Sequence, residues 1–138
     1  MNHEAEFRSW ASKSDIPKAI VESIIRYAPS KEGFKSPVEV MAPQIFPLDD
    51  ILRDQSRDYN DIDALADGLL IIGRCPNGDP IAIDIRQEPG SIWYISHEEM
   101  FGVPLRTVSI KVTNDIEEFV NQCENEQFPI DYFDARDV

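Results

Sequence analysis

The chain has 138 residues, with 26 acidic side chains against 13 lysines and arginines and a net charge of −13. This charge argues against binding to nucleic acids and to anionic membranes, because both need a surface rich in lysine and arginine. The length suits a single domain over 1–138, and a hydrophobic content of 42% is too high for a disordered chain.

The acidic residues are concentrated after residue 40. Residues 1–40 carry six acidic and six basic side chains, so the whole surplus lies in 41–138. Within that part, the segments 49–67 and 112–138 hold seven and eight acidic residues. Such segments are solvated faces in many acidic proteins, and they can also attract a basic protein partner. Composition leaves both interpretations open.

The N-terminus has neither a basic nor an apolar signal region, and no apolar run approaches the ~20 residues of a membrane span. We therefore expect a cytoplasmic protein with no membrane contact. Cys75 and Cys123 are expected to stay unpaired, because cytosolic chains rarely keep disulfides. No CxxC or HxxxH spacing accompanies them, and the segment His97-Glu98-Glu99-Met100 has one histidine, so no metal or cofactor is expected.

Helical spacing predicts two helices within residues 1–30. The first covers 3–13 and is weakly amphipathic. The second is stronger and ends near Ala28, with Ser14 or Asp15 as its N-cap and Pro17 tolerated in its first turn.

The following part of the chain is predicted to be mostly irregular. Residues 37–46 form a loop and a short strand that is broken at Pro43. Pro47 then begins a short helix, because proline suits the first helical position and two aspartates follow in the first turn. Residues 53–67 are expected to be a loop or a frayed helix.

Four strands are predicted in the centre of the chain from alternating apolar residues, at 69–75, 80–86, 91–96 and 106–112. The dipeptide Asn77-Gly78 between the first two tolerates positive φ and is typical of a tight hairpin turn. Because the connections are short, the sheet is expected to be an antiparallel meander.

A capping box of Asn114 and Glu117 predicts an amphipathic helix over 114–125. The tail over 126–138 is acidic and aromatic, and it suits either an added strand or a packed tail. The order of elements predicts the α+β class, with a twisted antiparallel meander and helices packed on one face.

Asp79 and Asp84 are the carboxylate pair to consider for catalysis. A hydrolase could use two carboxylates about 5–10 Å apart as acid and base. The alternative is structural: Asp79 satisfies amides of the turn, and Asp84 is solvated or pairs with Arg74 or Arg86. No nucleophile–base or metal motif accompanies the pair, so we predict that the protein is not an enzyme.

A partner-binding surface is predicted around the central hairpin. Trp93 and Tyr94 are adjacent in a strand and point to opposite faces, so one of them can be an exposed anchor. The rest of this predicted surface consists of the hairpin turn and the polar face of the sheet that carries Asp84. The predicted surface contains Asn77, Gly78, Asp79, Asp84, Trp93 and Tyr94. The alternative is that binding occurs on the acidic segments alone.

The centre of the chain resembles the SUKH superfamily, which includes fungal regulators of cell-wall glucan synthesis and many bacterial immunity proteins. The similarity covers about 37–124 and lies in four stretches in a fixed order. These are Asp67-Gly68-Leu69-Leu70-Ile71-Ile72-Gly73, Asn77-Gly78-Asp79-Pro80-Ile81-Ala82-Ile83-Asp84, Ile92-Trp93-Tyr94-Ile95-Ser96-His97-Glu98 and Val112-Thr113-Asn114-Asp115-Ile116-Glu117-Glu118-Phe119.

The resemblance implies an α+β protein-binding module without catalytic activity. Many bacterial members neutralise toxins, often nucleases, and a charge of −13 would suit a surface that attracts a basic toxin. One alternative is a regulatory scaffold of the same fold, and another is the hydrolase described above. At the front, Tyr27-Ala28-Pro29-Ser30 stands where the family usually has Asn-Gly-Gly.

Overall fold

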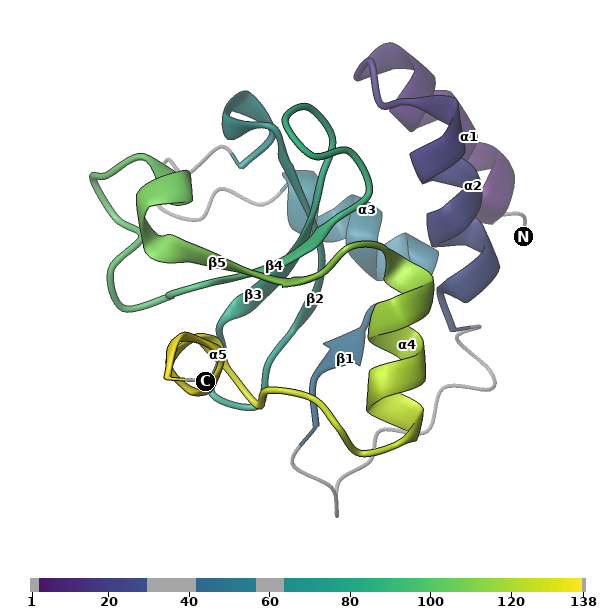
Figure 1. Cartoon of the computed structure of the whole chain (residues 1–138). Helices are drawn as coiled ribbons and strands as arrows, with labels where there is room; N and C mark the ends of the chain where they lie inside the picture. The colour runs from purple at the N-terminus through teal and green to yellow at the C-terminus, as the bar shows by residue number, and fades with distance from the viewer. Residues whose placement is uncertain (1–2, 30–41, 57–63, 138) are drawn as a thin grey trace.

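The computed structural model describes residues 3–29, 42–56 and 64–137 (Figure 1). Its centre is a five-stranded antiparallel sheet in the order β1-β2-β3-β4-β5. The strands are β1 (Gln44–Ile45), β2 (Leu69–Arg74), β3 (Pro80–Asp84), β4 (Ile92–Ile95) and β5 (Ser109–Thr113). The predicted meander is confirmed, and the short strand expected within 37–46 joins it at the β2 edge.

The sheet is accompanied by α-helices that lie mainly to its right in Figure 1, while the loop between β4 and β5 extends to the left. The helices of the described residues are α1 (His3–Lys13), α2 (Lys18–Tyr27), α3 (Leu48–Ser56), α4 (Ile116–Glu124) and α5 (Tyr132–Arg136). Two short 3-10 helices, η1 (Leu65–Asp67) and η2 (Leu105–Val108), precede β2 and β5.

The sheet separates two apolar clusters, because successive strand residues point to opposite faces. The larger cluster combines one face of the sheet with buried residues of all five helices, among them Phe7, Ile24, Ile51, Ile83, Tyr94, Phe119 and Tyr132. The smaller cluster lies on the other face and contains Ala64, Leu69, Ile71, Ala82, Ile95, Met100 and Leu105. The α-helices therefore pack on one face, as predicted, and the α+β class is confirmed.

The β2–β3 hairpin turns through Pro76-Asn77-Gly78. The Gly78 N–H donates to the Cys75 carbonyl at 2.9 Å, and the Cys75 N–H donates to the Asp79 carbonyl at 2.8 Å. Gly78 takes a φ of 100°, which favours glycine at this position. The connection is the three-residue hairpin in which a glycine supplies the left-handed residue.

The predicted start of the second helix is wrong by a few residues. α2 begins at Lys18, and Asp15 takes a φ of 57° in the turn that follows α1. Neither Ser14 nor Asp15 is the N-cap. Pro17 disfavours a helical conformation for the residue before it, so the helix does not extend further toward the N-terminus.

The fourth predicted strand is shorter than expected at its start. Residues 106–108 belong to η2, and β5 begins at Ser109. The Thr107 N–H and hydroxyl both donate to the Pro104 carbonyl, at 3.0 and 2.6 Å. These local bonds stabilise a turn in a segment whose side-chain alternation favours a strand.

The N-cap of α4 is Asp115, whereas the sequence pattern indicated Asn114. The Asp115 carboxylate accepts the Glu118 N–H at 2.8 Å, and the Glu118 carboxylate accepts the Asn114 N–H at 3.1 Å. Reciprocal capping is therefore present, with both capping side chains one residue later than predicted.

We expect Asp115→Ala to lower the free energy of unfolding by about 1 kcal/mol, because it removes this cap. Asn114→Ala is the matched control at an exposed neighbour and should change that free energy by less than about 0.5 kcal/mol. Urea unfolding of the two variants measures both values. Equal losses would contradict the assignment of the cap to Asp115.

Candidate functional site

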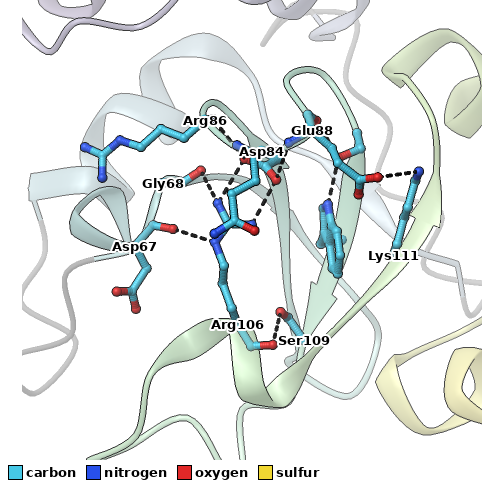
Figure 2. Close-up of polar contacts among 11 residues, drawn as sticks. Asp67, Gly68, Asp84, Arg86, Glu88, Arg106, Ser109 and Lys111 are labelled. Carbon is cyan, nitrogen blue, oxygen red and sulfur yellow. Dashed lines mark hydrogen bonds and ion pairs between the residues drawn. The ribbon is translucent and has the colours of Figure 1, made fainter.

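Asp84 is the last residue of β3, and its side chain is fully buried. Arg106 binds it as a fork: Nη1 donates to Oδ2 and Nη2 donates to Oδ1, both at 2.9 Å (Figure 2). The backbone N–H groups of residues 86, 87 and 88 donate to the same carboxylate at 2.9, 3.1 and 3.1 Å. Asp84 therefore fixes the turn after β3 as well as the guanidinium of Arg106.

Arg106 also bonds to the segment before β2. Its Nε donates to the Asp67 carbonyl at 2.9 Å, and its Nη2 donates to the Gly68 carbonyl at 3.3 Å. The Leu105 N–H donates to the Asp67 carboxylate at 3.0 Å. A Cβ on Gly68 would lie 2.8 Å from Arg106 Nη2, so glycine makes room for the guanidinium. We call Asp67, Gly68, Asp84 and Arg106 the Asp84–Arg106 cluster.

The ionised form of Asp84 is strongly favoured. Desolvation by burial alone would raise its pKa, but the bonds from Arg106 and the three backbone amides outweigh it and hold the pKa of Asp84 well below its usual range. The hydrogen bonds to Asp84 in turn raise the pKa of Arg106. An ionised carboxylate that is fully engaged in this way cannot serve as a general acid near neutral pH.

Asp79 holds a second polar cluster just before β3. Its Oδ1 accepts the His97 N–H at 3.0 Å and lies 2.5 Å from His97 Nδ1. Its Oδ2 accepts the Asn77 side-chain amide and the Tyr132 N–H, each at 2.9 Å. Burial would raise the pKa of Asp79, but these bonds lower it. This Asp79–His97 cluster joins the β2–β3 turn, the chain after β4 and the start of α5.

The C-terminal segment is a packed tail that ends in α5, and the alternative of an added strand is wrong. The Tyr94 hydroxyl donates to the Pro129 carbonyl at 2.7 Å, and Tyr132 is buried in the larger apolar cluster. Asp131 caps α5 by accepting the Asp134 N–H at 2.9 Å. The sequence did not predict the helix, because five residues are too few to show a helical period.

The two carboxylates do not share a cleft. Asp79 precedes β3 and Asp84 ends it, so five steps of extended chain, about 16 Å, separate their Cα atoms. The odd spacing also places their side chains on opposite faces of the sheet. The two-carboxylate geometry that motivated the hydrolase alternative is therefore absent from this pair.

The salt bridge predicted for Asp84 forms with a different arginine. The side chain of Arg86 donates to the Ala66 carbonyl at 2.9 Å, and Arg74 lies over the Phe46 ring at 5.9 Å. The prediction of Arg74 or Arg86 as the partner is wrong. It was based on residues that lie near Asp84 in the β2–β3 hairpin, and it did not consider more distant segments. Arg106 comes from η2 and is 22 residues away in sequence.

The six residues of the predicted binding surface differ in exposure. Those with fully buried side chains are Asp79, Asp84 and Tyr94. Those that reach the surface at least in part are Asn77, Gly78 and Trp93. Trp93 packs against the smaller cluster, and its Nε1 donates to the Ser91 hydroxyl at 2.8 Å. The sheet face that was expected to be polar is therefore apolar and covered. Whether this region binds a partner stays a prediction.

The loop over 97–104 was not singled out by the sequence. Its stems are held by the two clusters, through His97 at one end and Leu105 and Arg106 at the other. Its tip contains Phe101 and Val103, which are 48% and 42% exposed. The signal that could have found it is an apolar run, Met100-Phe101-Gly102-Val103-Pro104-Leu105, outside every predicted strand and helix.

Within 3–29, 42–56 and 64–137, no group of three or more histidine, cysteine, aspartate or glutamate side chains is arranged to hold a metal ion. No helix in those ranges has the length and apolarity to span a bilayer. Cys75 and Cys123 are both unpaired, as predicted. Burial raises the pKa of the Cys123 thiol to about 11 and raises that of Cys75 as well.

Comparison of the chain with curated proteins and with solved structures gives no match. The family model described as SMI1 / KNR4 family (SUKH-1) matches residues 15–122. This range begins before the 37–124 region recognised in the sequence, so α2 is part of the match. It includes Asp79, Asp84 and Arg106 with their supporting turns. Because the match covers most of the chain, the chain belongs to the SMI1/KNR4 family (SUKH-1).

Proposed function

We propose that this chain is a non-catalytic module that binds a basic protein in the cytoplasm and neutralises it, as immunity proteins of the SUKH superfamily do. The observation that carries the proposal is the net charge of −13, which lies entirely after residue 40. Family membership supports a binding role, and the charge supports the choice of a cationic partner.

The surface of α4 carries exposed carboxylates that have no ion-pair partner among the described residues. Glu117 and Glu124 are exposed, and neither forms an ion pair with a residue in the described ranges. The two basic residues within 109–137, Lys111 and Arg136, each lie 3.4 Å from another carboxylate. Exposed negative charge of this kind attracts a basic surface over roughly 10 Å at 0.1 M salt and raises the association rate.

A regulatory scaffold is the alternative use of the same binding module. The two functions differ in what happens to the partner. A neutralised toxin loses its activity when one equivalent of this chain is bound, whereas the partner of a scaffold keeps its activity. Enzymatic or growth-inhibition assays of the partner, alone and in the complex, distinguish the two.

The binding probe is chosen by gene neighbourhood, as a purified product of an adjacent gene whose sequence is basic. We expect stable binding whose association rate falls on the order of tenfold when salt rises from about 0.05 M to about 0.5 M. Glu117→Gln with Glu124→Gln should lower the association rate and its salt dependence, with a smaller effect on dissociation. Surface plasmon resonance measures both rates.

Glu4→Gln with Glu6→Gln on α1 is the matched control, because these glutamates lie in the part of the chain whose net charge is zero. This pair should leave the association rate nearly unchanged. Equal effects of the two pairs, or binding that does not respond to salt, would contradict electrostatic attraction to the acidic surface. Absence of binding would overturn the proposal as a whole.

A further inference from the structure

The loop over 97–104 presents an apolar tip whose two large side chains are about half exposed. In the described residues, three large hydrophobic side chains are exposed, and Phe101 and Val103 are two of them. Gly102 lies between them with a φ of 77°, and a Cβ placed on it would meet no atom within 4 Å. The loop therefore turns sharply at its tip and directs apolar side chains into solvent.

The same loop is anchored at both ends. Ser96 N–H donates to the Val108 carbonyl at 2.8 Å, which joins the two stems directly. Met100 and Leu105 are buried in the smaller apolar cluster on either side of the tip. Asp79 binds His97 at one stem, and the Asp84–Arg106 cluster binds the other. A loop held in this way loses little conformational entropy when a partner binds its tip.

Carboxylates flank the apolar tip on its N-terminal side. Glu98 and Glu99 are exposed, and neither forms an ion pair with a described residue. An apolar centre with an acidic border complements a basic surface that contains an apolar depression. A second copy of this chain is a poor occupant, because two chains of charge −13 would bring the same carboxylates together.

We propose that the loop tip of Phe101 and Val103 inserts into an apolar depression on the basic protein partner, with Glu98 and Glu99 meeting cationic side chains around it. This inference rests on the proposed function and assigns its contact surface. Asp79 and Asp84 then act in binding as positioning residues, because they hold the two stems of the loop while remaining buried.

The experiment measures binding of the same neighbouring-gene product to the full chain and to two matched variants. Phe101→Ala should weaken the equilibrium affinity by at least about tenfold, mainly through faster dissociation, because it removes a central aromatic anchor. Ile130→Ala removes the third exposed large hydrophobic residue, which lies outside the loop, and should change affinity by less than about twofold.

A second measurement tests the positioning role. Asp79→Asn should weaken binding in the wild-type background and should have much less effect in the Phe101→Ala background, because both changes act through the loop. Such coupling in a double-mutant cycle is not expected if Asp79 only supports global stability. Thermal unfolding confirms that each variant is folded at the temperature of the binding assay.

The outcomes separate this inference from the proposed function. Salt-dependent binding that Phe101→Ala leaves unchanged would overturn the loop surface and leave the proposed function standing. Failure of the wild-type chain to bind would overturn both. Light scattering on the free chain gives a further outcome: a dimer that Phe101→Ala dissociates would assign the tip to self-association and overturn the inference.

Discussion

Replacing Asp84 with alanine is expected to lower the free energy of unfolding by about 3–5 kcal/mol. The change leaves the Arg106 guanidinium without its carboxylate and leaves three backbone N–H groups of the following turn without their acceptor. Because Asp84 is fully buried, little water can replace these bonds without rearrangement. Urea unfolding monitored by tryptophan fluorescence measures the loss.

Glu88→Ala is the control for the Asp84 variant. Glu88 and Lys111 form an ion pair at 3.4 Å with both side chains exposed (Figure 2). A pair of this kind contributes at most about 1 kcal/mol, because solvent screens it. If Asp84→Ala costs no more than Glu88→Ala, the buried pair does not stabilise the fold as described.

Acid unfolding gives a second measure of the same interaction. The pKa of Asp84 is lower in the folded protein than the roughly 3.9 of an unfolded aspartate, so its contribution is complete above about pH 4. Stability is then lost as the pH falls toward the folded-state pKa. The lowered pKa of Asp79 acts in the same direction. The Asp84→Ala variant should therefore lose less stability than the wild type on acidification below pH 4.

The meander could be predicted from the sequence because each of its signals is local. Residues 69–72 are a continuous apolar run, and in 80–84 isoleucines at 81 and 83 share one face of the strand. Gly78 marks the turn between the two strands. The amphipathic stripe of α4 was equally clear. The errors in the fold prediction lie at the ends of helices and strands. There a single residue, such as Pro17 or Thr107, moves the boundary without changing the periodic pattern from which the element was predicted.

The candidate site was harder to predict because it depends on contacts between distant segments. The sequence identified Asp79 and Asp84, but it gave no reason to pair Asp84 with Arg106 or Asp79 with His97 and Tyr132. His97 and Tyr132 lie in segments without a repeating pattern, and Arg106 was assigned to the start of a strand that is not adjacent to β3. The proposal for the 97–104 loop depends on the burial of its neighbours, which the sequence does not give. Part of the acidic segment 49–67 lies outside the described residues.

Phe119→Ala is the second substitution with a large expected effect. It should lower the free energy of unfolding by about 3–5 kcal/mol, because it empties a buried position between α4 and the sheet. Phe119 is 1% exposed, and its ring meets that of Tyr94 edge-on with centroids 6.2 Å apart. The cavity would lie beside a tyrosine whose hydroxyl holds the C-terminal tail at Pro129. Calorimetry should show a lower unfolding temperature and, because the tail contact is affected, faster proteolysis near the C-terminus.

Phe101→Ala is the natural control for Phe119→Ala, since it removes the same side chain from an exposed loop tip. We expect its unfolding free energy to change by no more than about 0.5 kcal/mol, while its affinity for the partner falls. Phe119→Ala should show the opposite pattern at temperatures where it stays folded. The pair of variants therefore tests whether stability and recognition depend on different phenylalanines. Equal effects of the two variants on both quantities would contradict the proposed division between a helix-packed core and a binding loop.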